Sequence, residues 1–150
     1  MDALWQRLKG VTQMTLEAEY AGALWAGQGC VDVHTLAGEN QLVFQEEGAW
    51  HATRGHVQPF INQYVWAFDF AKHSFSLHRK RAEAKAPELL ARFIQNVACH
   101  TQALPWKQAV PHLCGEDCYK VALELAPSSL SLNWRIHGPE KRDQVRITYF

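Results

Sequence analysis

The chain has 150 residues, of which 47 % are hydrophobic and 20 % are charged, and this composition excludes the disordered and low-complexity classes. Fifteen basic residues balance fifteen acidic ones, so the net charge gives no attraction toward nucleic acid or an anionic membrane surface. The length suits one domain, and we expect a single domain over residues 1–150.

The cysteines and the first residues bear on the cellular compartment. Four cysteines are too few and too unevenly spaced for a disulfide framework in a chain of this length. Residues 1–9 lack the basic start, apolar run and small-residue cleavage site of a secretory signal, and no stretch approaches the roughly 18 apolar residues of a membrane helix. We therefore expect a cytoplasmic protein without a membrane partner.

The spacing of apolar residues predicts one short helix followed by strands. Leu4, Trp5 and Leu8 lie at helical spacing and predict an amphipathic helix over residues 1–9. Beyond Gly10, apolar and polar residues alternate, as in strands with one face in contact with water. The alternation predicts eight strands, over residues 12–20, 24–36, 41–50, 60–70, 74–79, 119–125, 130–136 and 144–150.

Two segments in the middle of the chain do not follow the strand alternation. Ala86, Leu89, Leu90, Phe93, Ile94 and Val97 recur at helical spacing, and Pro87 suits a first helical turn, so we expect a helical insertion over residues 86–97. The one basic run, His78-Arg79-Lys80-Arg81, is interpreted as a solvated strand end rather than as a phosphate contact.

Antiparallel strands at short, regular intervals predict either a sandwich or a closed barrel. We favour an all-β fold with one or two short helices, in the form of an antiparallel up-and-down β-barrel of about eight strands. Closure leaves no strand edge exposed. The interior of such a barrel is filled by side chains or holds one small ligand.

Two motifs in the last third of the chain carry a resemblance to a known family. They are His112-x-Cys114-x-x-Asp117-x-Tyr119 and Trp134-x-Ile136-x-Gly138-Pro139-x-Lys141. With these motifs the chain resembles the uncharacterised lipocalin-like (calycin-type) barrels of small bacterial proteins, which are grouped as a domain of unknown function with H-x-C-x-x-D-x-Y and W-x-V-x-G-P-x-K patterns. The resemblance implies a lipocalin-like barrel without an assigned activity. A further family pattern, R-x-Y-x-W, is matched by Tyr64 and Trp66, but Asn62 stands in the place of its Arg, so a function that depends on that Arg does not carry over.

Glu46 is unusual because it follows Leu42 and Phe44 on a row of otherwise apolar side chains. A buried, unpaired carboxylate costs several kcal/mol, so Glu46 must be paired, neutral or in contact with a wet cavity. It either orients a ligand or acts as a general base with a raised pKa, or it forms an internal pair. The internal partners that we consider are Arg135, Arg54, Lys141 and the hydroxyl of Tyr64.

Residues 111–119 contain the densest chemistry in the sequence. The simplest interpretation is a barrel corner in which Asp117 caps backbone amides and His112 donates to a carbonyl. A zinc site formed by His112, Cys114 and Cys118 with His100 is a weak alternative, because the spacing is permissive without being a signature. A Cys114 nucleophile activated by His112 is a further alternative, although no oxyanion hole is recognisable.

Our first hypothesis is a module that binds a small, largely apolar molecule with one polar group inside the barrel. The residues expected at this ligand site are Phe44, Glu46, Tyr64, Trp66, His112, Tyr119, Trp134 and Lys141. The second hypothesis is an enzyme in which Glu46, His112 and Asp117 act as acid–base groups at the barrel mouth, and the third is a filled barrel that acts as an interaction module. No cofactor, metal or nucleic-acid partner is expected, and the sequence leaves a monomer and a homodimer equally open.

Overall fold

The computed structural model describes residues 1–36, 38–53, 55–96 and 105–150. In these ranges one helix, α1 (Asp2–Lys9), precedes eleven strands. The strands are β1 (Gln13–Tyr20), β2 (Ala23–Thr35), β3 (Gln41–Ala52), β4 (Val57–Asp69), β5 (Ser74–Lys80), β6 (Glu88–Gln95), β7 (Trp106–Gln108), β8 (His112–Cys114), β9 (Asp117–Leu125), β10 (Leu130–His137) and β11 (Arg142–Tyr149).

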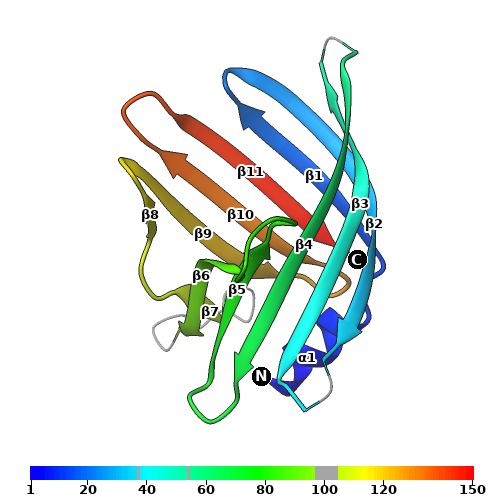
Figure 1. Ribbon diagram of the computed structural model, residues 1–150, viewed down its shortest axis with the longest axis vertical. Coiled ribbons are helices and arrows are strands. Elements are labelled where there is room, and N and C mark those ends of the chain that lie inside the picture. Colours follow the sequence, from blue (N-terminus) through cyan, green and yellow to red (C-terminus); the bar gives the residue numbers. More distant parts are fainter. Residues whose placement is uncertain (37, 54, 97–104) are drawn as a thin grey trace.

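The strands form one antiparallel sheet that closes into a barrel (Figure 1). Consecutive strands pair from β1 to β7, β9 follows β7, and β9 also pairs with β10, which joins β11 and then β1. Ten strands therefore make the ring, and β8 is an additional strand paired with β9. The expected all-β antiparallel barrel is confirmed, but the expected number of about eight strands is too low.

The shortest seam of the ring lies between β7 and β9. One residue pair, Lys107 with Ala122, joins these strands by register. The side chain of Gln108 extends the seam, because its Oε1 accepts a hydrogen bond from the backbone N–H of Val121 at 2.9 Å and its Nε2 donates to the carbonyl of Tyr119 at 3.3 Å. A side-chain amide thus replaces backbone pairing where β7 ends.

The expected helix over residues 86–97 is wrong, because Glu88–Gln95 forms strand β6 between β5 and β7. Ala91 and Phe93 are buried in the barrel interior, whereas Leu89 and Ile94 are exposed. The register shifts between Leu77, which pairs with Ala91, and His78, which pairs with Leu89. This β-bulge interrupts the alternation of inward and outward residues along β6. Pairing with two neighbouring strands outweighs the helical spacing, and Val97 lies outside the described residues.

The expected N-terminal helix is confirmed, and α1 covers one end of the barrel (Figure 1). Leu4 and Leu8 are buried against the barrel core, and the ring of Trp5 packs edge-on against Phe68 with 5.0 Å between centroids. The guanidinium of Arg7 donates from Nη1 to the carbonyl of Ala126 at 2.7 Å, which ties the helix to the β9–β10 turn. Within the described ranges, no helix is both long and apolar enough to cross a membrane.

Aromatic side chains fill the interior next to α1. Phe75 stacks on Phe93 with 4.8 Å between ring centroids and on Phe68 with 5.3 Å, and Trp66 lies 6.0 Å from Phe75. The end opposite α1 carries the β1–β2 turn, the β3–β4 hairpin and the β10–β11 turn (Figure 1). Aromatic side chains therefore fill the end of the barrel beside α1, and the three turns named above surround the opposite end.

Gly29 of β2 and Gly48 of β3 are register partners, and neither has a side chain between the two strands. A Cβ on Gly48 would overlap the carbonyl oxygen of Gln28 and lie 2.7 Å from both the Cα of Gly29 and the ring of Phe60. Glycine at position 48 therefore lets the Phe60 ring lie directly on the strand. Phe60 packs on Trp50 with 6.0 Å between ring centroids, and both rings form part of the interior wall.

Candidate functional site

The candidate site is a cavity of about 490 Å³ inside the barrel, toward the end opposite α1. Its lining extends to Tyr20 and Gln58, which lie beside the β1–β2 turn and the β3–β4 hairpin. The walls are mostly apolar and include Leu16, Trp50, Phe60, Leu90, Ile136 and Ile147. A group of polar residues, Glu46, Asn62, Tyr64 and Arg79, interrupts this apolar lining.

The alternation along β3 points Glu46 inward beside the apolar residues of the same row. Its side chain is 1 % exposed. The hydroxyl of Tyr149 donates to Oε1 at 2.6 Å, and Nδ2 of Asn62 donates to Oε2 at a long 3.5 Å. The adjacent strand β4 and the more distant strand β11 therefore supply the hydrogen-bond donors of one buried carboxyl group.

Arg79 extends this group of polar residues from β5. Its Nη2 donates to Oδ1 of Asn62 at 3.4 Å, and the register places it directly opposite Tyr64. We call Glu46, Asn62, Tyr64, Arg79 and Tyr149 the Glu46 cluster. The cluster runs as a chain of contacts from a fully buried phenol to a guanidinium at the cavity surface.

Burial controls the protonation of the Glu46 cluster. Loss of solvation raises the pKa of Glu46 from 4.5 to about 7, although the hydrogen bonds from Tyr149 and Asn62 and the charge of Arg79 act in the opposite direction. Burial, assisted by the negative charge of Glu46, raises the pKa of Tyr64 to about 12 and that of Tyr149 well above its usual value. Both phenols therefore remain donors at neutral pH, where Glu46 is close to half ionised.

The variant Tyr149→Phe is expected to raise the pKa of Glu46 above that of the wild type. The Tyr149 hydroxyl stabilises the carboxylate form, and its removal leaves burial less opposed. Carbon NMR of labelled glutamate side chains during a pH titration measures this change. An unchanged or lower pKa would show that the hydrogen bond does not favour the ionised form.

The structure separates six of the eight expected ligand-site residues into two groups. Glu46, Tyr64, Tyr119 and Trp134 line the cavity. Phe44 and Trp66 are 0 % exposed and belong to the packed core, with 5.7 Å between their ring centroids. They lie on the expected inward rows but nearer the filled end of the barrel, so they support the cavity without facing it.

The expected partners of Glu46 are not the ones it has. Arg135 lies on the outer face, Lys141 pairs with Asp117, and Tyr64 makes no hydrogen bond to Glu46 among the described residues, which do not include Arg54. Tyr149 and Arg79 were missed, although both continue inward rows. Arg79 follows Phe75 and Leu77 at period two, so its interpretation as a solvated strand end is wrong.

Residues 112–119 form the β8–β9 hairpin beside the cavity mouth. Pairing of His112 with Tyr119 and of Cys114 with Asp117 places these four side chains on one face, and Cys118 lies on the other. His112 packs edge-on against Tyr119 with 5.8 Å between centroids, and no hydrogen bond joins it to a carboxylate in the described part of the chain. The hairpin thus presents no acid–base pair to the cavity.

The residues of the alternative zinc site do not gather at this hairpin. Cys114 and Cys118 point to opposite faces, and His100 lies outside the described residues. Among the residues with described positions, no three His, Cys, Asp or Glu side chains are arranged to hold a metal ion.

Lys141 and Asp117 join two turns at the barrel mouth. Nζ of Lys141 lies 2.8 Å from Oδ2 of Asp117, which connects the β10–β11 turn with the β8–β9 hairpin. A Cβ on Gly138 would overlap the Asp117 carboxylate, so a side chain at this position would displace that carboxylate. Neither Lys141 nor Asp117 lines the cavity, and both act structurally at its rim.

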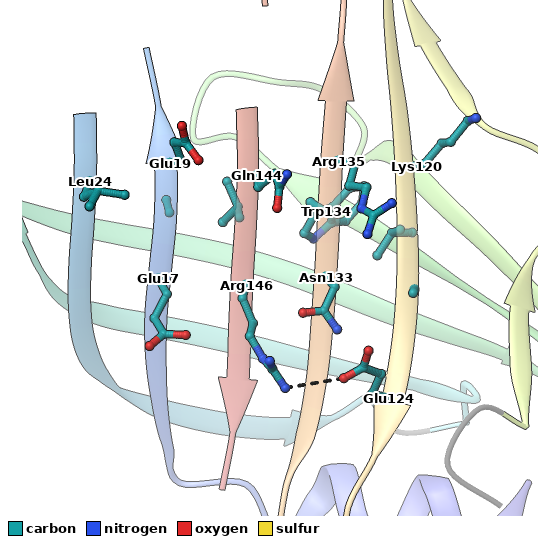
Figure 2. Close-up of a pocket in the computed structure, with 14 residues that line it drawn as sticks. Glu17, Glu19, Leu24, Lys120, Glu124, Asn133, Trp134, Arg135, Gln144 and Arg146 are labelled. Carbon is teal, nitrogen blue, oxygen red and sulfur yellow. Dashed lines mark hydrogen bonds and ion pairs between the residues drawn. The ribbon is translucent and has the colours of Figure 1, made fainter. Parts of the chain in front are cut away.

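A second concave surface lies outside the barrel, across β1, β11, β10 and β9. Figure 2 shows the charged side chains of these strands standing on the outer face, with an ion pair of 3.4 Å between Arg146 and Glu124. Its acidic residues, Glu17, Glu19 and Glu124, are balanced by three basic ones, Lys120, Arg135 and Arg146. This open groove is electrically balanced and its buried polar group is the neutral amide of Asn133, whereas the interior cavity contains a buried carboxyl group, and we take the interior cavity as the candidate site.

Comparison with known proteins places the chain in a family but assigns no activity. Residues 6–150 match the model of a family of unknown function (DUF6314). No curated protein and no solved structure matches the chain significantly. The function must therefore be inferred from the interior cavity itself.

Proposed function

The chain belongs to the DUF6314 family of unknown function, and from its interior site we propose that it binds a small, largely apolar molecule with one polar group. The observation that carries the proposal is the apolar cavity of about 490 Å³ interrupted by the Glu46 cluster. Ligand pockets typically measure roughly 300–1,000 Å³ and combine apolar walls with a few convergent polar groups.

The position of Glu46 supports binding rather than a purely structural role. A carboxyl group that is 1 % exposed destabilises a packed core, because burial opposes its ionisation. Its presence in the wall of a cavity therefore favours a role beyond packing. The indole N–H of Trp25, which also lines the cavity, has no hydrogen-bond partner in the described part of the chain. A ligand with a polar group would supply partners to such atoms.

The other two functional hypotheses have weaker support. The pKa of Glu46 near 7 suits a general base, but His112 and Asp117 lie outside the cavity lining, so the three expected acid–base residues do not converge. A filled barrel acting only through its surface is disfavoured by the cavity.

Two further features fit the proposed role. The pairing of consecutive strands around the ring, with one end left open, supports a lipocalin-like barrel. The free thiols of Cys30, Cys114 and Cys118 support a reducing, cytoplasmic location.

The variant Ala18→Phe tests whether the cavity binds ligand. Ala18 is 8 % exposed and lines the cavity, so a phenyl ring at this position occupies part of the ligand volume. We expect at least a roughly tenfold loss of affinity for an alkyl probe such as 1-decanol, measured by isothermal titration calorimetry, because displaced apolar contacts weaken binding. Native mass spectrometry of the wild type and the variant also reports any co-purifying ligand.

The matched control is Ala26→Phe. Ala26 lies on the outer face of the neighbouring strand β2 and is exposed, so the same ring is added outside the barrel. The affinity of this control for 1-decanol should stay within about twofold of the wild-type value. The loss expected for Ala18→Phe is larger, because a tenfold loss corresponds to about 1.4 kcal/mol. Equal binding by wild type and Ala18→Phe would place the ligand elsewhere and contradict the proposed function.

A further inference from the structure

Arg79 is a cation in the cavity lining, and its one side-chain hydrogen bond to a described residue goes to the neutral amide of Asn62, at 3.4 Å from Oδ1. In the described part of the chain, no carboxylate lies within ion-pair distance of its guanidinium. Glu88 faces Arg79 in the strand register but pairs with Arg81 at 3.4 Å. Most of the Arg79 donors are thus unpaired, and arginine stays charged at every physiological pH.

The charge balance of the cavity depends on Glu46. Glu46 and Arg79 are the charged residues in the described lining. With its pKa near 7, Glu46 is largely protonated in mildly acidic solution, and Arg79 then leaves the cavity with one uncompensated positive charge. A partly buried, unpaired charge is unfavourable and is stabilised by an anion.

Tyr64 adds a neutral donor beside Arg79. The two residues are direct register partners on β4 and β5, and both line the cavity. The Tyr64 hydroxyl makes no hydrogen bond to another described residue, and its high pKa keeps its proton in place. A planar guanidinium and a phenol on two register partners form a pair of donors for the two oxygens of a carboxylate.

Building on the proposed function, we propose that the ligand is an amphiphile with a carboxylate, which Arg79 and Tyr64 bind while the apolar part lies along the cavity walls. The residue at position 62 is consistent with this arrangement. Asn62 contacts both Glu46 and Arg79, so the cation of the site comes from β5 and not from β4.

Binding of an anion is coupled to the protonation of Glu46. The polar groups that face Glu46 are Tyr149 from β11, Asn62 and Tyr64 from β4 and Arg79 from β5, whereas its β2 partner, Val31, is apolar. A second negative charge nearby favours protonated Glu46. Affinity for a carboxylate ligand should therefore increase as the pH falls from about 8 to about 6, where the ligand, with a pKa near that of a free carboxyl group, stays ionised.

Three probes that share one alkyl chain test the proposal: decanoate, 1-decanol and decylamine. At about pH 6, calorimetry of the wild type is expected to rank decanoate first, with at least roughly tenfold higher affinity than 1-decanol. Arg79→Gln should remove about tenfold or more of the decanoate affinity and leave 1-decanol nearly unchanged. Arg79→Lys, which keeps the charge but not the planar fork, should give an intermediate loss.

The matched control is Arg92→Gln, which removes the same charge from an exposed position on the outer face of β6. It should bind decanoate as the wild type does, and circular dichroism confirms that each variant is folded. If 1-decanol or decylamine binds as tightly as decanoate, or if Arg79→Gln and Arg79→Lys both keep the decanoate affinity, the carboxylate assignment is wrong while the binding function stands. If none of the three probes binds the wild type, the proposed function fails as well.

Discussion

Glu46→Gln is expected to raise the free energy of unfolding by about 3 kcal/mol at about pH 8 and to change it little at about pH 4. The pKa of Glu46 is 4.5 when solvated and about 7 in the folded barrel. Each unit of difference corresponds to about 1.4 kcal/mol between the two protonation states. Glutamine keeps an oxygen for the Tyr149 hydroxyl and has no charge to bury.

The sign of this effect follows from proton binding. Below about pH 4.5 both the folded and the unfolded chain hold the Glu46 proton, and the wild type has no ionisation penalty. Between about 4.5 and about 7 the unfolded chain releases the proton while the folded chain retains it, so wild-type stability falls as the pH rises. Above about pH 7 the loss is complete.

Urea denaturation of both proteins over this pH range measures the difference directly. Glu47→Gln is the matched control, because Glu47 is the next residue of β3 and is exposed on the outer face. The control should differ little from the wild type at any pH. A Glu46→Gln difference that does not grow with pH would mean that the folded barrel stabilises the ionised carboxylate as well as water does.

Gly48→Ala is expected to destabilise the barrel by about 3 kcal/mol or more, at the upper end of the usual cost of overpacking. A Cβ at this position overlaps the carbonyl oxygen of Gln28 and lies 2.7 Å from the Cα of Gly29. Both are backbone atoms, so no side-chain rotation relieves the contact. Strands β2 and β3 must separate, and the wall formed by Trp50 and Phe60 moves with them.

Gly10→Ala provides the comparison for a tolerated glycine replacement. The nearest atom to a Cβ at Gly10 is the carbonyl oxygen of Arg7 at 3.6 Å, an ordinary contact, and its φ of −88° suits any residue. Its unfolding free energy should stay within about 1 kcal/mol of the wild type. Thermal and urea denaturation measure both variants, and a Gly48→Ala protein as stable as Gly10→Ala would show that the two strands separate at little cost.

The free-energy cost of burying Glu46 and the binding of the proposed ligand both depend on the proton of Glu46. A carboxylate ligand on Arg79 increases the fraction of protein with protonated Glu46, so proton uptake should accompany binding near neutral pH. The cost of burying Glu46 is then reduced in the complex. Control of the net charge of the cavity would explain why the barrel contains a carboxyl group that destabilises its empty form.

The period-two patterns in the sequence predicted most strands because one face of each packs on the barrel core. The row that contains Phe44 and Glu46 and the row that contains Tyr64 and Trp66 both point inward as expected. Strands β7 and β8 were missed because three residues are too few for an alternating pattern. Strand β6 was missed because its bulge breaks the period-two alternation, and the apolar residues then recur at a spacing that also fits a helix.

The sequence by itself determined that the chain begins with a short helix, continues in strands with one face toward a core, and places Glu46 on an inward, apolar row. These properties depend on local alternation, which any neighbouring strand preserves. Only the tertiary structure decided which residues surround Glu46. Asn62, Arg79 and Tyr149 come from three strands, and the register between strands brings them together across separations in sequence of up to 103 residues. The period-two row of Phe75 and Leu77 points Arg79 inward, but only the register of the closed sheet places it beside Tyr64 and Asn62.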